Sequence, residues 1–240
     1  MNSFVTWLPS SITLLGLSAG LSGLRAATLG EWEQAVMFVL LAALCDGLDG
    51  RVARYFKVSS EFGAQLDSLT DSICFGVTPA LILYLWGLQE ASAWSWLAVL
   101  FFILSCVLRL ARFNLSQGTA PGAVTPPRFF VGLASPVGAL LLLTPMMLHF
   151  SGLGHWLRSP LLLVFCLLGV GVLMISRIPT LSIKHLSLRE HPMFWGLLAL
   201  ALFWAFALGK AFWLTLALTL FAYLLSIPAG SWYAQFVRSR

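Results

Sequence analysis

Residues 46–71 read DGLDGRVARYFKVSSEFGAQLDSLTD, and this stretch contains every aspartate of the chain. Asp46 and Asp49 are three residues apart, and Asp67 and Asp71 are four residues apart. Each pair therefore shares one face of a helix. The residues between the two pairs predict a short break, so the two helices are expected to be antiparallel neighbours whose carboxylates converge on one place.

The composition around this stretch is that of a membrane protein. Of 240 residues, 59% are hydrophobic and only 10% are charged, whereas soluble domains carry about 25% charged residues. The four cysteines lie in apolar runs without a CxxC spacing, which favours buried thiols over zinc or disulfides. The net charge of +5 comes from residues in short loops, so a nucleic-acid-binding surface is not expected.

The apolar runs predict an all-α integral membrane protein with about eight transmembrane helices, since a helix needs about 20 apolar residues to cross a bilayer. A count of seven with a re-entrant end is the alternative. Small residues in the first run suit close helix packing, and a Pro/Gly/Thr-rich connector is expected at 116–127. The expected spans are 8–25, 32–56, 62–88, 93–115, 128–149, 159–177, 192–209 and 211–230.

The basic residues predict the orientation of these helices. With a cytoplasmic N-terminus, 11 of the 14 Lys and Arg residues fall on the cytoplasmic side, and only Arg25, Arg158 and Lys210 fall on the other. Positive charge is retained in the cytoplasm. The stretch 46–71 is therefore expected at the cytoplasmic end of the second and third spans.

The convergence of four carboxylates indicates a site for hard divalent cations, which take oxygen ligands and share them with substrate phosphates. Gly50 and Gly63 leave room for a ligand beside the backbone, and Arg51 and Arg54 can pair with phosphate. Phosphoryl chemistry at the membrane surface is the favoured interpretation. An ion-coupled membrane carrier and structural Asp–Arg pairing are the alternatives.

The stretch also resembles a known family. It fits the pattern D-x2-D-G-x2-A-R-x8-G-x3-D-x3-D of the CDP-alcohol phosphotransferases without a mismatch, at Asp46, Asp49, Gly50, Ala53, Arg54, Gly63, Asp67 and Asp71. The resemblance implies two divalent cations, Mg²⁺ or Mn²⁺, held by the four aspartates, with Asp71 also acting as the general base. It implies that Gly50, Ala53, Arg54 and Gly63 bind the CDP-linked substrate. It further implies one membrane domain over 1–240, with a six-helix catalytic core at 1–190 and two additional helices at 191–240.

Flanking segments, such as RLARFN at 109–114 and FFVGLASP at 129–136, resemble the branch that transfers a phosphatidyl group from CDP-diacylglycerol to L-serine in the bacterial cytoplasmic membrane. That resemblance implies a homodimer. It also implies that Arg109, Arg112 and Asn114 bind serine or the lipid phosphate. Sister enzymes that use glycerol 3-phosphate, inositol phosphate or choline as the acceptor remain the alternative.

Overall fold

The computed structural model describes residues 3–56, 58, 60–118, 129–131, 133–176, 179–181, 212–222 and 224. These residues are helical apart from turns and one short pair of strands. The main helices are α1 (Ser3–Thr28), α2 (Trp32–Phe56), α3 (Glu61–Asp71), α4 (Thr78–Gly87), α5 (Ala93–Gly118), α6 (Ser135–Leu142), α7 (Thr144–Phe150) and α8 (Pro160–Ile175). A π-helical turn, η1 (Ser72–Val77), joins α3 to α4, and a 3₁₀ turn, η2 (His155–Arg158), precedes α8. A further helix covers Phe212–Ala222.

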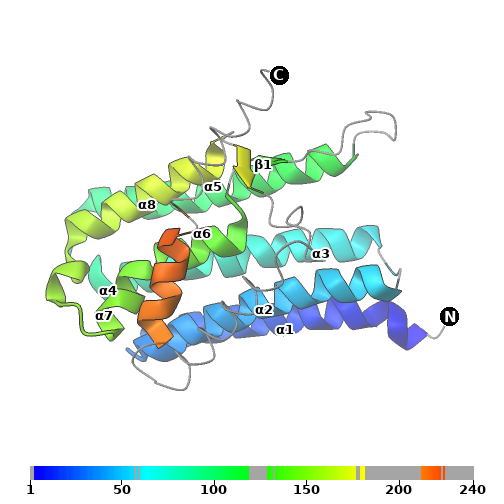
Figure 1. Ribbon diagram of the computed structural model, residues 1–240, viewed down its shortest axis with the longest axis horizontal. Helices are drawn as coiled ribbons and strands as arrows, with labels where there is room; N and C mark the ends of the chain where they lie inside the picture. The colour runs from blue at the N-terminus through cyan, green and yellow to red at the C-terminus, as the bar shows by residue number, and fades with distance from the viewer. Residues whose placement is uncertain are drawn as a thin grey trace.

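The α1 and α2 helices, the continuous segment α3–η1–α4, α5, the segment α6–α7 and α8 run in alternating directions along the long axis of the bundle (Figure 1). The rod formed by α3, η1 and α4 returns beside the α1–α2 hairpin, and α5 and α8 form the opposite side. The short connections 29–31 and 88–92 lie at one end of the bundle. The end of α2 and the start of α3 lie at the other end, together with the N-terminus of α1. The two halves of the aspartate stretch are thereby brought side by side.

Glycines on α1 allow its close approach to its neighbours. A Cβ atom placed on Gly20 would lie 2.6 Å from the sulfur of Cys74, and one on Gly23 would lie 3.0 Å from the carbonyl oxygen of Ala35. Side chains at these positions would push the helices apart. This confirms the prediction that small residues in the first apolar run allow close packing between helices.

The π-helical turn η1 lies directly after Asp71, and within it the amide of Thr78 donates to the carbonyl of Ile73, five residues earlier. Pro79 gives a physical reason for this wider turn. It has no amide hydrogen, and its ring would clash with the carbonyl of residue 75 in a regular helix. Widening the turn before the proline relieves that clash, and such turns occur often at functional sites.

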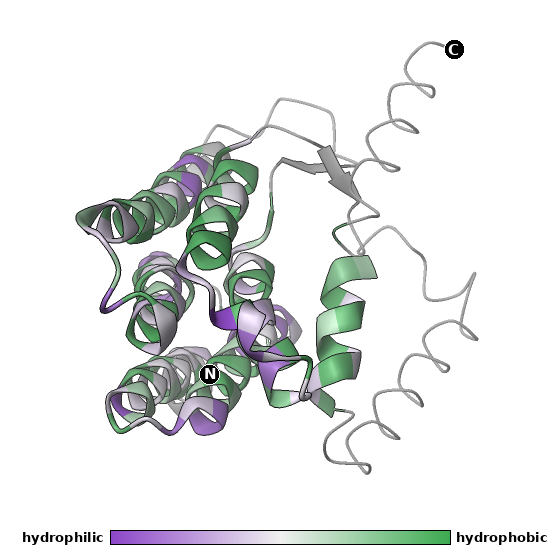
Figure 2. Cartoon of the chain, turned by 90° about the vertical axis from the view of Figure 1, so that its left-hand side faces the viewer, coloured by the Kyte–Doolittle hydropathy of each residue, from purple (hydrophilic) through white to green (hydrophobic). Residues whose placement is uncertain are grey.

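Two helical stretches, Glu61–Gly87 and Ala93–Leu115, are long and apolar enough to cross a membrane, and the shorter helices Pro160–Ile175 and Phe212–Ala222 are also apolar. Viewed end-on, apolar residues predominate along the helices (Figure 2). The interior of the bundle is filled by large apolar side chains, including Phe75, Trp86 and Phe102.

The observed helix bounds confirm most of the predicted segments, and 32–56 agrees at both ends. The prediction of one helix over 128–149 is wrong. Residues Phe129–Val131 form strand β1, which pairs antiparallel with β2 (Pro179–Leu181), and the first helix begins only at Ser135. The helical segment is also divided at Leu143, because Pro145 has no amide to donate to the carbonyl of Leu141 and its ring would clash with that carbonyl in a continuous helix.

The predicted span 192–209 and most of the predicted connector 116–127 lie outside the described residues. Of the predicted span 211–230, the structure describes the helix Phe212–Ala222.

Candidate functional site

The facing ends of α2 and α3 bring the aspartates together. Carboxylate oxygens of Asp46, Asp49 and Asp67 all lie within 4.8 Å of one another. All four aspartates line one small cavity of about 10 Å³, a volume on the order of one water molecule or one ion. The structure thus places on one spot the residues that the helical spacing predicted would converge.

Asp49 is held in place by α1. Its side chain is only 5% exposed, and its Oδ2 atom accepts a 2.6 Å hydrogen bond from the hydroxyl of Thr13. The same hydroxyl lies 3.1 Å from the carbonyl oxygen of Pro9. These two contacts orient the Thr13 side chain, which in turn fixes one oxygen of Asp49.

Asp71 is the last residue of α3 and lines the same small cavity. Its side chain lies beside those of Asp46 and Asp67. Its Oδ1 atom is buried and has no hydrogen-bond partner among the described residues. The guanidinium of Arg109 on α5 exerts its charge on both Asp71 and Asp46. Arg109 therefore lies beside the aspartates, and its positive charge complements their carboxylates.

These carboxylates fit a divalent cation. At 4.8 Å and an effective dielectric constant of about 20, two negative charges repel by about 3.5 kcal/mol. Three such pairs amount to about 10 kcal/mol, which is comparable with the whole stability of a typical protein. Only a concentrated positive charge, or protons, can offset this repulsion. An all-oxygen donor set with an unpaired buried carboxylate oxygen suits a hard cation such as Mg²⁺ or Mn²⁺.

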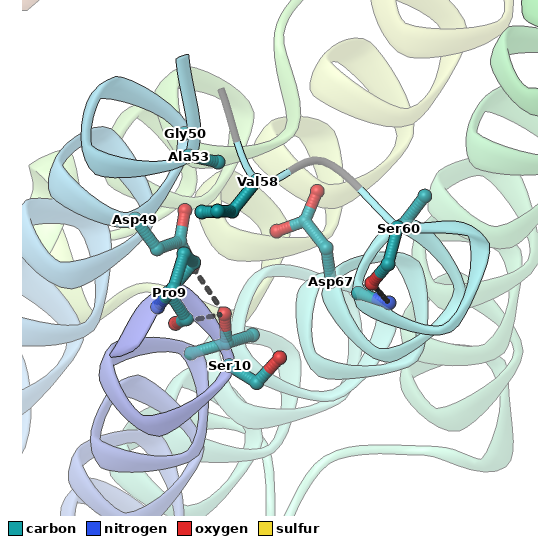
Figure 3. Close-up of a pocket in the computed structure, with 11 residues that line it drawn as sticks. Pro9, Ser10, Asp49, Gly50, Ala53, Val58, Ser60 and Asp67 are labelled. Atoms are coloured by element: carbon teal, nitrogen blue, oxygen red, sulfur yellow. Dashed lines mark hydrogen bonds between the residues drawn. The ribbon is translucent and has the colours of Figure 1, made fainter. Parts of the chain in front are cut away.

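A second cavity of about 160 Å³ opens beside the aspartates, between the start of α1, the end of α2 and the start of α3. Figure 3 shows Asp49 and Asp67 at this cavity, with Pro9 and Ser10 from α1 on one side. Its volume is below the roughly 300–1,000 Å³ of a typical ligand pocket. It therefore suits one part of a ligand and not a whole phospholipid.

Three of the four residues predicted to bind the CDP-linked substrate line this second cavity, namely Gly50, Ala53 and Gly63. Gly63 is packed tightly, since a Cβ atom there would lie 3.1 Å from the hydroxyl of Ser60, which caps α3 by accepting from the amide of Gly63. Arg54 does not line the cavity. It is exposed on α2, with a terminal nitrogen 4.0 Å from the place of a Cβ atom on Gly50.

The residues predicted to bind the acceptor have partners within the protein. Arg109 donates to the hydroxyl of Ser135 at the start of α6, while its Nε atom is buried without a partner among the described residues. Arg112 donates to the carbonyl oxygen of Ile175 at the end of α8, at 2.7 Å. These contacts tie α5 to α6 and α8.

Asn114 forms a reciprocal pair with Ser68, which directly follows Asp67. The Asn114 amide nitrogen lies 2.9 Å from the Ser68 oxygen, and the Asn114 oxygen lies 3.1 Å from it. The end of α5 is thus attached to α3 next to the aspartates.

Sequence reasoning missed the hydroxyl groups of the site, those of Thr13, Ser68 and Ser135. Each lies in or next to an apolar helix, where a small polar residue normally indicates close packing. Only the register between the helices distinguishes these three from the other serines and threonines.

Carboxylate sites of this kind serve phosphoryl chemistry, and two helical stretches of this bundle are long and apolar enough to cross a membrane. The chain belongs to the CDP-alcohol phosphatidyltransferase family, whose profile matches residues 6–175.

Several curated relatives carry the name CDP-diacylglycerol–serine O-phosphatidyltransferase. The protein from Mycobacterium leprae is 38% identical over 223 residues, which cover 92% of this chain and 73% of the relative. The protein from Mycobacterium tuberculosis is 36% identical over 234 residues, covering 95% and 80%. The protein from Helicobacter pylori strain 26695 is 34% identical over 173 residues, covering 71% and 70%.

Proposed function

We propose that this protein transfers the phosphatidyl group of CDP-diacylglycerol to L-serine, giving phosphatidylserine and CMP. The observation that carries the proposal is the cluster of Asp46, Asp49 and Asp67, whose oxygens lie within 4.8 Å of one another. The names of the relatives support both substrates.

In the proposed reaction, Asp46, Asp49, Asp67 and Asp71 hold two divalent cations, Mg²⁺ or Mn²⁺. When bound, these cations offset the charge of the diphosphate and polarise its phosphorus centres. Gly50, Ala53 and Gly63 line the cavity that receives the nucleotide end of CDP-diacylglycerol. Its acyl chains remain in the bilayer.

Asp71 is the proposed general base, because its Oδ1 atom is buried and has no partner among the described residues. It accepts the hydroxyl proton of serine. The serine oxygen then forms a bond to the phosphorus on the diacylglycerol side, and the bond from that phosphorus to the oxygen shared with CMP breaks. Arg54, which lies near Gly50 without lining the cavity, is the proposed partner of the leaving phosphate. Arg109, Arg112 and Asn114 remain candidates for binding serine or the lipid phosphate, with Arg109 nearest the aspartates.

The proposal includes a multi-pass arrangement of about eight spans, six of them in the catalytic core at 1–190, in the bacterial cytoplasmic membrane. The excess of Lys and Arg on one side supports an active site that faces the cytoplasm. A homodimer remains a prediction of the family resemblance.

The test is release of CMP by the purified protein supplied with CDP-diacylglycerol and L-serine. We expect release only with a divalent metal, and loss of it in Asp71→Asn. Glu61→Gln is the matched control, because it removes an exposed carboxylate from the first turn of the same helix. Metal-independent turnover or an active Asp71→Asn would refute the proposal.

A panel of acceptors with one donor tests the choice of alcohol. If glycerol 3-phosphate, inositol phosphate or choline is used in preference to serine, the protein is a sister enzyme of the family. Substrate flux through sealed vesicles without CDP-diacylglycerol would instead indicate the ion-coupled carrier.

A further inference from the structure

Two threonine side chains line the aspartate cavity, Thr13 from α1 and Thr70 from α3. The hydroxyl of Thr13 donates to Asp49. The hydroxyl of Thr70 has no hydrogen-bond partner among the described residues, although the residue is only 6% exposed. A buried hydroxyl without a partner is unfavourable, because it has given up its hydrogen bonds with water.

Thr70 also forgoes the partner that a helix offers locally. Hydroxyl groups inside helices commonly donate to the carbonyl four residues earlier. Thr144 does so to Leu140, and Ser72 does so to Ser68. No such bond joins Thr70 to Leu66, so its oxygen has lone pairs to offer at the wall of a cavity that four carboxylates surround.

We propose that the hydroxyl of Thr70 is an additional oxygen ligand of a divalent cation in this cavity, reached directly or through one bound water. A hydroxyl adds a ligand without adding charge, and hard cations accept such ligands alongside carboxylates. This role rests on the metal dependence in the proposed function. Thr70 lies between Asp67 and Asp71, at a position where the family pattern allows any residue.

The experiment measures Mn²⁺ affinity of the full-length protein in detergent, by calorimetry or by the electron paramagnetic resonance of free Mn²⁺. In Thr70→Val the side chain keeps its shape and loses the oxygen. We expect the dissociation constant for Mn²⁺ to rise roughly tenfold, as for other supporting groups at metal sites. Thr70→Ser, which keeps the hydroxyl, should stay within about twofold of the unmodified protein on the same scale.

Thr78→Val is the matched control. Thr78 is fully buried, and its hydroxyl also has no partner in the described part of the chain, but it does not line the aspartate cavity. Both valine variants should keep or raise the melting temperature without metal, while only Thr70→Val loses Mn²⁺ affinity.

Equal Mn²⁺ binding by Thr70→Val and the unmodified protein would overturn the role of Thr70 and leave the proposed function intact. Equal weakening in Thr78→Val would overturn it as well. Absence of Mn²⁺ binding to the unmodified protein would overturn both the role of Thr70 and the metal dependence.

Discussion

Replacing Thr13 with valine removes one hydroxyl from the wall of the site while keeping the shape of the side chain. That hydroxyl donates to Asp49 at 2.6 Å. Asp49 is 5% exposed, so water has little access to replace the lost donor. A hydrogen bond to a charged group contributes about 1.5–3 kcal/mol. For a chain of 150–250 residues, each kcal/mol changes the melting temperature by about 2–4 °C.

Thr13→Val should therefore lower the melting temperature by about 3–12 °C, measured by thermal unfolding of the purified protein in detergent with EDTA present. Thr13→Ser should recover most of the loss. Ser11→Ala is the control on the same helix, because Ser11 donates only to the carbonyl of Trp7 on the exposed face. If Thr13→Val and Ser11→Ala have the same melting temperature, the hydrogen bond from Thr13 to Asp49 contributes nothing to stability.

Two further substitutions test the packing and the α5 contact. Gly20→Ala should lower the free energy of unfolding by about 1–3 kcal/mol, because its Cβ atom would lie 2.6 Å from the sulfur of Cys74. Gly169→Ala is the control and should not lower it, since a Cβ atom there would have nothing within 4 Å. Equal melting temperatures of the two variants would contradict the close packing of α1. Asn114→Ala should reduce CMP release. If Asn114 acts by holding α3 through Ser68, Ser68→Ala should reduce CMP release as well. A fully active Ser68→Ala would instead indicate that Asn114 contacts the substrate.

The positions of the helices could be predicted well from the sequence, because apolar run length and the breaks between runs determine them. The bounds 32–56 follow from those rules. The convergence of Asp46, Asp49 and Asp67 follows from their helical spacing together with the break between the two pairs. The start of the fifth segment could not be predicted. Phe129–Val131 is as apolar as a helix, and its pairing with β2 depends on a partner some 50 residues further along the chain.

The contacts that support the site, such as those of Arg112 and Thr13, also could not be predicted from the sequence. The resemblance predicts that Arg112 binds serine or the lipid phosphate, and the structure joins it to the end of α8. Thr13 lies in a run of small residues with no local signal of its role. Both depend on the register between helices far apart in the chain, which local spacing does not encode.

The π-helical turn at Ser72–Val77 has a consequence for how this chain can change length. An α-helix turns by about 100° per residue, so inserting or deleting one residue in a regular stretch rotates everything beyond it away from its neighbours. A π turn already accommodates one extra residue. A one-residue deletion inside it would leave an ordinary α-helix and restore the clash between the ring of Pro79 and the carbonyl four residues earlier. The aspartates of α3 and the packed side chains of α4 would still face the same partners. This turn is therefore where the rod can lose one residue and keep both of its faces in register.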